Sequence, residues 1–347
     1  MKHTIIIAEA GVNHNGSYQR AVEMIHAAAA AGVDYVKFQT FKAENLVSAS
    51  ARRAEYQKRN CGGEDESQLS MLRSLELTYA DFESLAYECR KAGVGFMSTP
   101  FDIESIDFLS TLGMDYWKIP SGEITNLPYL RKIASKGGRS ILSTGMSTID
   151  EVVAAVDVLE SGGLPRCGIY LLHCTTQYPT PYADVNLRAM EALRGVGCRG
   201  VGYSDHTAGI SVPVAAVALG AEIIEKHFTL DRNLPGPDHK ASLDIEGLCD
   251  MVRSIRDVEL AMGDGIKSVA EAEKANIPVA RKSIVAACEI AAGELFTDQN
   301  LVAKRPGTGI SPMLWDKVIG TRATRCYSKD ELIDPDTIPS VLSGGQP

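Results

Sequence analysis

The chain has 347 residues, 45% of them hydrophobic, and a formal net charge of −9. This length suits one large domain with a small one attached, and the apolar content is sufficient for a sizeable core. The acidic balance argues against a nucleic-acid partner, because such proteins present basic surfaces. No run approaches the roughly 18 apolar residues of a membrane helix, so no membrane partner is expected.

The start of the chain and its cysteines indicate a cytoplasmic protein. Glu9 interrupts the apolar run from Thr4 to Ala8, so the hydrophobic region of a signal peptide is missing. Eight cysteines are scattered without a CxxC pair, which is typical of free thiols in a reducing compartment. Neither disulfides nor a zinc finger is expected.

Short β-rich apolar runs alternate with helical segments along most of the chain. The helical segments 17–32 and 147–163 carry Ser or Asp start signals and Gly stop signals. Eight runs are predicted as strands, at 4–11, 35–41, 95–101, 116–123, 140–146 and 169–174 and at the beginnings of 201–212 and 222–231. Eight βα alternations predict an α/β fold, a (β/α)8 TIM barrel.

The chain is predicted to have a barrel domain at 1–269, a linker at 270–282 and a small β-rich domain at 283–347. The last segment is small enough that we expect it to need a partner surface for stability. The connection 42–69, after the second strand, is far longer than the usual two to six residues. It is a candidate lid.

Two histidines, His206 and His227, lie at the ends of consecutive strands. In TIM barrels the active site forms at the carboxyl ends of the strands, and two neutral imidazoles there are typical of a metal site with open positions. Each histidine alone would more often be a core residue. Asp205, Glu9 and Glu225 stay open as hydrogen-bond acceptors behind the ligands, acid/base groups or a third ligand.

Polar residues at other strand ends indicate an anion pocket. Lys37 and Lys118, with the hydroxyls of Thr99, Ser121 and Ser143, are suited to a phosphate and a carboxylate. The alternative is that the lysines cap strands in solvent, which the apolar neighbours of Lys37 argue against. Pairs two residues apart share one face of a strand: Lys37 with Gln39, Ser204 with His206, and Glu225 with His227.

Two loops add candidates of another kind. The Pro-rich loop 173–187 contains Tyr178 and forms either a rigid wall for a sugar or a packing element. The turn 304–311, "KRPGTGIS", either delivers Arg305 into the barrel of another subunit or is simply solvated.

Taken together, the motifs resemble those of the sialic acid synthase family, the N-acetylneuraminate or nonulosonate synthases. The resemblance covers nearly the whole chain and depends on motifs found in this order: "AEAGVNHNGS", "VKFQTF", "STPFD", "KIPSGE", "ILSTGM", "YPTP", "GYSDHT", "IIEKHFTLD", "GPDHKASL" and "KRPGTGISP". The last of these lies in a tail that resembles the antifreeze-like (SAF) domain of the same enzymes.

The resemblance implies condensation of phosphoenolpyruvate with an acetamido mannose-type sugar, with C–O cleavage and phosphate release. A divalent metal, manganese first with magnesium or cobalt as alternatives, would be held by His206 and His227, and Glu9 and Glu225 would be the acid/base candidates. Phosphoenolpyruvate would contact Lys37, Thr99, Lys118, Ser121, Ser143 and Ser204. The sugar would contact Gln39, Tyr178, Asp238 and, from the partner of a domain-swapped homodimer, Arg305; Glu123 of "KIPSGE" is counted with the substrate-binding residues.

Two sugars are compatible with these motifs. The first expectation is N-acetylmannosamine, which gives N-acetylneuraminate. The alternative is 2,4-diacetamido-2,4,6-trideoxymannose, which gives N,N'-diacetyllegionaminate. A Schiff-base pyruvate aldolase, with Lys37 or Lys118 as the nucleophile, ranks behind both because it leaves His206 and His227 without a role.

Overall fold

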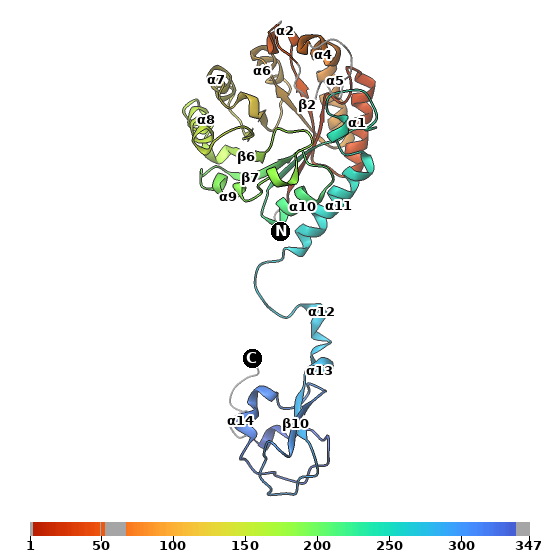
Figure 1. The fold of residues 1–347 in the computed structure, drawn as a ribbon, viewed down its shortest axis with the longest axis vertical. Coiled ribbons are helices and arrows are strands. Elements are labelled where there is room, and N and C mark those ends of the chain that lie inside the picture. Colours follow the sequence, from red (N-terminus) through yellow and green to blue (C-terminus); the bar gives the residue numbers. More distant parts are fainter. Residues whose placement is uncertain (1–2, 49, 53–66, 338–347) are drawn as a thin grey trace. The chain divides into compact units, whose positions relative to one another are not determined.

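The computed structural model describes residues 3–48, 50–52 and 67–337. The chain divides into two compact units, Met1–Asp264 and Gly265–Pro347, and each is described by itself. In the first unit, helices surround a ring of strands (Figure 1). No helix in the described ranges is long and apolar enough to cross a membrane.

Eight parallel strands form the first unit's sheet in the order β3-β2-β1-β8-β7-β6-β5-β4, and β3 contacts β4 to close it. They are β1 (Ile5–Gly11), β2 (Tyr35–Thr40), β3 (Gly95–Pro100), β4 (Trp117–Ile119), β5 (Ser140–Ser143), β6 (Ile169–Cys174), β7 (Gly200–Asp205) and β8 (Ile223–His227). The predicted TIM barrel of the α/β class is therefore confirmed.

Helices cover the outside of the barrel, and several of them begin and end at typical capping residues. Ser17 caps the first of them by accepting from the backbone N–H of Arg20, and Gly32 ends it in the left-handed conformation. The helices between the strands and after β8 are α1 (Tyr18–Ala31), α2 (Ala43–Leu46), α4 (Gln68–Leu75), α5 (Tyr79–Ala92), α6 (Ile103–Leu109), α7 (Leu127–Lys136), α8 (Ile149–Ser161), α9 (Ala189–Arg194), α10 (Ser211–Ala218) and α11 (Ile245–Ala261).

The interior of the barrel is filled with apolar side chains below the carboxyl ends of its strands. Ile7, Met97, Ile141, Leu172 and Ile223 form this inner cluster, while the opposite faces of the strands pack against the helices. A polar site therefore fits only at the carboxyl ends of the strands. The register places functional candidates side by side there: Glu9 lies beside Lys37 and His227, and Ser204 beside Glu225.

Two predicted strands were too long. The fourth ends at Ile119 because Pro120 follows, which has no N–H to donate, and Ser121–Glu123 instead form a short 3-10 helix. The fifth ends at Ser143. The long connection after β2 contains α2 and runs into α4; most of the predicted lid, residues 49 and 53–66, lies outside the described residues.

A buried ion pair joins the ends of β7 and β8 on their outer face. The Lys226 ammonium donates to the Asp205 carboxylate and, at 2.7 Å, to the carbonyl of Thr207. The Asp205 carboxylate also accepts from the Tyr203 hydroxyl and the Thr207 backbone N–H. Asp205 and His206 are adjacent, so their side chains leave the chain in opposite directions. Asp205 is not among the described residues that line the cavity, and the structure assigns it to this ion pair.

The second unit has its own small core. β9 (Ser283–Ala286) and β10 (Leu301–Lys304) pair antiparallel, and η5 (Pro312–Leu314) and α14 (Trp315–Val318) follow. Ile284, Phe296 and Tyr327 are among the buried residues of this unit. The stretch predicted as a linker contains two exposed short helices, α12 (Glu271–Lys274) and α13 (Ile277–Ala280).

Candidate active site

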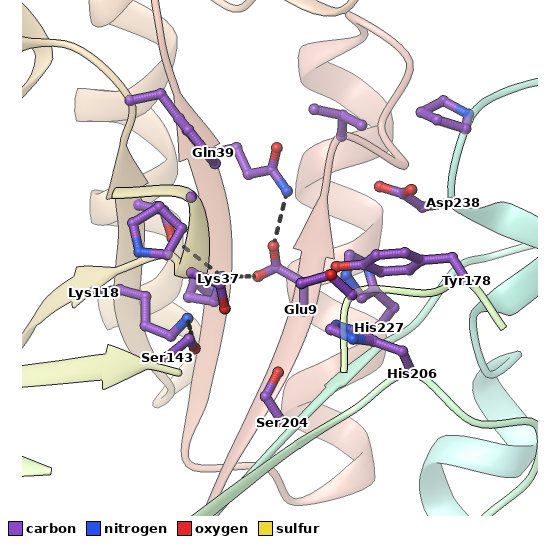
Figure 2. Close-up of a pocket in the computed structure, with 18 of the residues that line it drawn as sticks. Glu9, Lys37, Gln39, Lys118, Ser143, Tyr178, Ser204, His206, His227 and Asp238 are labelled. Carbon is purple, nitrogen blue, oxygen red and sulfur yellow. Dashed lines mark hydrogen bonds and ion pairs between the residues drawn. The ribbon is translucent and has the colours of Figure 1, made fainter. Parts of the chain in front are cut away.

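A cavity of about 320 Å³ opens at the carboxyl ends of the barrel strands. Figure 2 shows Lys37 and Lys118 on one side of Glu9, and His206 and His227, which come from the ends of β7 and β8, on its other side. Most of the residues predicted from the sequence line it: Glu9, Lys37, Gln39, Thr99, Lys118, Ser121, Ser143, Tyr178, Ser204, His206, Glu225, His227 and Asp238.

Two predicted site residues do not line the cavity. Glu123 belongs to the 3-10 helix after β4, and its carboxylate accepts from the Asn126 side chain at 2.6 Å. It is not among the described residues that line the cavity, and its role as a substrate contact stays a prediction. Arg305 belongs to the second unit, where its Nε donates to the Ala280 carbonyl. Its role across subunits stays a prediction.

Two lysines and two glutamates form a buried charge cluster at the base of the cavity. Lys37 Nζ lies 2.7 Å from Glu9 Oε2 and 3.6 Å from Glu225 Oε2. Lys118 Nζ lies 3.3 Å from Glu225 Oε1. Each lysine also donates to a hydroxyl, Lys37 to Thr99 at 3.2 Å and Lys118 to Ser143 at 2.8 Å. The predicted anion pocket thus has two desolvated cations whose charges are balanced by carboxylates.

The two carboxylates of this cluster have opposite pKa shifts. Burial raises the pKa of Glu9, and Lys37 opposes this only in part. Burial acts in the same direction on Glu225, but Lys118 and Lys37 outweigh it and lower its pKa to about 2. Glu225 also accepts from the Ser204 hydroxyl at 2.9 Å. Glu225 therefore stays ionised at neutral pH, and Glu9 is the carboxyl that takes up a proton more readily.

The two histidines meet the requirements of a metal pair. Their ring centroids lie 5.6 Å apart. Burial lowers the pKa of His206 to about 4 and that of His227 well below its ordinary range, so both imidazoles are neutral at pH 7. The carbonyl of Thr175 accepts from His206 Nδ1 at 2.6 Å, which leaves Nε2 with a free lone pair. His227 Nδ1 is buried without a hydrogen-bond partner in the described part of the chain.

These observations fit a divalent cation with few protein ligands. Within the described residues no three His, Cys, Asp or Glu side chains are grouped closely enough to hold a metal ion. Other coordination positions would therefore belong to water or substrate oxygens. The Tyr178 ring packs against both imidazoles, with centroid distances of 4.1 Å to His206 and 5.8 Å to His227. Tyr178 thereby restricts how the rings can turn.

Gly11 is essential to the shape of the site. It has a φ of +54°, and a Cβ there would lie 3.2 Å from Glu9 Oε1, 3.3 Å from Gln39 Nε2 and 3.4 Å from His227 Cε1. The β1–β2 register shifts between Glu9 and Gly11, as at a β-bulge. Glycine is needed here both for its backbone conformation and for the space it leaves.

Sequence reasoning missed the non-ionic parts of the pocket. The Cys174 thiol lies 3.2 Å from the Ser121 hydroxyl, which also accepts from the backbone N–H of Gly145 at 2.9 Å. Apolar residues of α2 and α4 line another side of the cavity. Polar residues at strand ends can be recognised in the sequence. The sequence does not distinguish an apolar side chain that lines a pocket from one in a core.

The raised pKa of Asp238 predicts how the stability of the protein depends on pH. Burial and the nearby charge of Glu9 raise the pKa of Asp238 from 3.8 to about 7. Between these values the folded protein binds more protons than the unfolded chain, so its stability falls as pH rises. Asp238→Asn should therefore be more stable than the unmodified protein at pH 8, by up to about 4 kcal/mol, with a smaller gain at pH 5.

Urea unfolding of the metal-free protein at both pH values measures this difference. Asp257→Asn, at an exposed position of α11, is the matched control and should change stability little at either pH. A gain for Asp238→Asn that is equal at pH 5 and pH 8 would contradict the prediction.

Comparison with known proteins identifies the family. The NeuB family model matches residues 24–267, and the SAF domain model matches residues 281–339. The N,N'-diacetyllegionaminic acid synthase of Campylobacter jejuni is 52% identical, covering 96% of this chain and 99% of its own. The enzyme of the same name from Legionella pneumophila is 48% identical, with coverages of 91% and 89%.

A solved structure agrees with this assignment. The N-acetylneuraminic acid synthetase of Leptospira borgpetersenii superposes with a TM-score of 0.69 at 33% identity, covering 79% of this chain and 90% of its own. Of the described cavity-lining residues, only Glu9 and Val12 precede the stretch that the NeuB family model matches. The chain therefore belongs to the NeuB family of phosphoenolpyruvate-dependent nonulosonic acid synthases, with a SAF domain after its barrel.

Proposed function

We propose that this enzyme condenses phosphoenolpyruvate with 2,4-diacetamido-2,4,6-trideoxymannose to form N,N'-diacetyllegionaminate and phosphate. The observation that carries the reaction type is the placement of two buried lysines beside two neutral histidines in one cavity. The choice of sugar is supported by relatives of that name at 52% and 48% identity, against 33% for the N-acetylneuraminic acid synthetase. This reverses the order of the two sugars expected from the motifs.

Phosphoenolpyruvate would occupy the base of the cavity. Lys37 and Lys118 are held on neighbouring sides of Glu225, and both ammonium groups are desolvated. Charge-assisted hydrogen bonds from such groups to phosphate and carboxylate oxygens are strong. The hydroxyls of Thr99 and Ser143 already hold the two ammonium groups in place, so little reorganisation is needed when the anion binds.

The aldehyde end of the open-chain sugar would lie beside His206 and His227. A divalent metal bound by these residues, manganese in this proposal, would polarise the aldehyde oxygen when present. Tyr178 keeps the imidazoles turned toward the cavity, and Gln39 and Asp238 line the space next to them. In this arrangement the sugar carbonyl would lie next to C3 of phosphoenolpyruvate.

The two carboxylates would have different roles: Glu225 would stabilise positive charge, and Glu9 would transfer protons. As C3 attacks the aldehyde carbon, positive charge develops at C2, and the ionised Glu225 at the base of the cavity stabilises it. Glu9, whose pKa is raised, provides the proton that the new hydroxyl needs and accepts the proton that water loses as it adds to C2. The C2–O bond to phosphate then breaks as the C2 hydroxyl becomes the keto group and passes its proton to the leaving phosphate, whose charge the lysines stabilise.

The test is phosphate release from phosphoenolpyruvate with either sugar. We expect kcat/KM for the diacetamido sugar to exceed that for N-acetylmannosamine, exhaustive chelation to abolish release, and manganese to restore it. Preference for N-acetylmannosamine would overturn the assignment of the sugar, and activity after chelation would overturn the metal.

We also propose a homodimer in which Arg305 reaches the partner's cavity, so inactive Arg305→Ala and His227→Ala chains should regain activity when mixed.

A further inference from the structure

One side of the cavity is apolar, in contrast to its charged base. It consists of Leu46 and Val47 from the end of α2 and of Met71, Leu72 and Leu75 from α4, which we call the rim wall. The two helices contact each other and lie side by side at the top of the barrel in Figure 1. The wall is therefore part of the folded rim, built from two elements.

The rim wall is packed as firmly as a core. Met71, Leu72 and Leu75 are only 6%, 8% and 6% exposed, and they form one cluster with Val12 and Phe41 that is separate from the barrel cores. Leu69, also on α4, packs against this cluster without lining the cavity. Packing α4 onto the barrel thus leaves one of its faces for the cavity, and that face has only one polar contributor among the described lining residues, Gln68.

The position of the rim wall matches the far end of the sugar. If phosphoenolpyruvate fills the cavity base and the aldehyde lies beside His206 and His227, the chain of the sugar extends toward the rim. The chain itself runs from the cavity to the rim wall at Gln39, because β2 ends at Thr40 and α2 begins at Ala43. The carbon most distant from the aldehyde, C6, then meets the rim wall.

We propose that the rim wall is the specificity determinant that selects sugars with a methyl group at C6 over sugars with a C6 hydroxyl. This inference rests on the proposed function. A C6 methyl would bury apolar surface against leucine and methionine side chains, whereas a hydroxyl there would lose water without gaining a hydrogen bond. Differences of this kind change kcat/KM by roughly 10- to 100-fold.

The experiment compares two sugars that differ only at C6: 2,4-diacetamido-2,4,6-trideoxymannose and its 6-hydroxy counterpart. Val47→Thr places one hydroxyl in the wall at nearly constant volume, and Val47 is only half-buried, so the fold should tolerate it. Leu72→Asn makes a larger change of the same kind. Leu69→Asn is the matched control, because it puts the same amide on the same helix away from the cavity.

The expected result is a preference of the unmodified enzyme for the 6-deoxy sugar of about 10-fold or more. This ratio should fall about tenfold in Leu72→Asn and less in Val47→Thr, with an unchanged KM for phosphoenolpyruvate, and stay constant in Leu69→Asn. An unchanged ratio in both wall variants, or an equal fall in Leu69→Asn, overturns the inference. Absence of phosphate release with every sugar would instead refute the proposed function, so the two failures are distinguishable.

Discussion

Replacing His227 by alanine should abolish divalent-metal binding and lower phosphate release from phosphoenolpyruvate and sugar by more than about 100-fold. Loss of a residue that only hydrogen-bonds to a metal ligand already lowers metal affinity or activity by about 10- to 100-fold, and His227 would be a ligand itself. The described residues offer only two histidines at this position, and His206 alone would make one bond to the ion. The fold should persist, because His227 ends its strand and its ring faces the cavity. Manganese binding is measured by electron paramagnetic resonance of the free enzyme, and turnover by phosphate release.

His26→Ala is the matched control for this prediction. His26 is exposed on α1 and is not among the described residues that line the cavity, so its loss should leave both readouts unchanged. If His227→Ala bound manganese with unchanged affinity, the metal assignment would be wrong. If it lost manganese but kept full turnover, the ion would have no part in the reaction.

Lys226→Met should reduce the free energy of unfolding by about 3–5 kcal/mol, because it leaves the buried Asp205 carboxylate without its cation. Lys226 is 1% exposed and also donates to the Thr207 carbonyl, so the substitution leaves two buried acceptors without their donor. Urea unfolding at neutral pH measures the loss. Manganese affinity should fall as well, since Asp205 and Lys226 precede the two histidines directly.

Arg253→Met is the surface comparison, because the Arg253–Asp250 pair on α11 is exposed and should be worth less than about 1 kcal/mol. Adding Asp205→Asn to Lys226→Met should recover part of the lost stability, since the uncompensated charge is then gone. A loss in Lys226→Met no larger than that in Arg253→Met would show that the pair does not stabilise the barrel.

The sequence was most informative where chemistry and strand periodicity coincide. Glu225 and His227 are two residues apart at a strand end, so they had to share a face, and the register brings Ser204 beside Glu225 as the predicted barrel requires. Lys37 could be predicted as buried from its apolar neighbours. Its partner could not, because Glu9 is 28 residues away and the pairing depends on the register between the first two strands.

Other features needed three-dimensional information for different reasons. Glu123 was predicted at the end of a strand, but the strand ends before Pro120 and Glu123 belongs to a 3-10 helix. Leu72 has no chemical signature that separates a pocket wall from a core. Arg305 lies in a unit described by itself, so its reach into another subunit depends on an assembly that one chain does not specify.

The glycine at position 11 has a consequence for how enzymes of this kind diversify. Any other residue there would be strained by the positive φ and would crowd the Glu9 and Gln39 side chains, so substitutions at the centre of the site are costly. Leucine, valine and methionine positions on α2 and α4 can be exchanged one at a time at modest cost. New sugar preferences should therefore arise first by substitutions on these two helices, while the reaction itself stays the same.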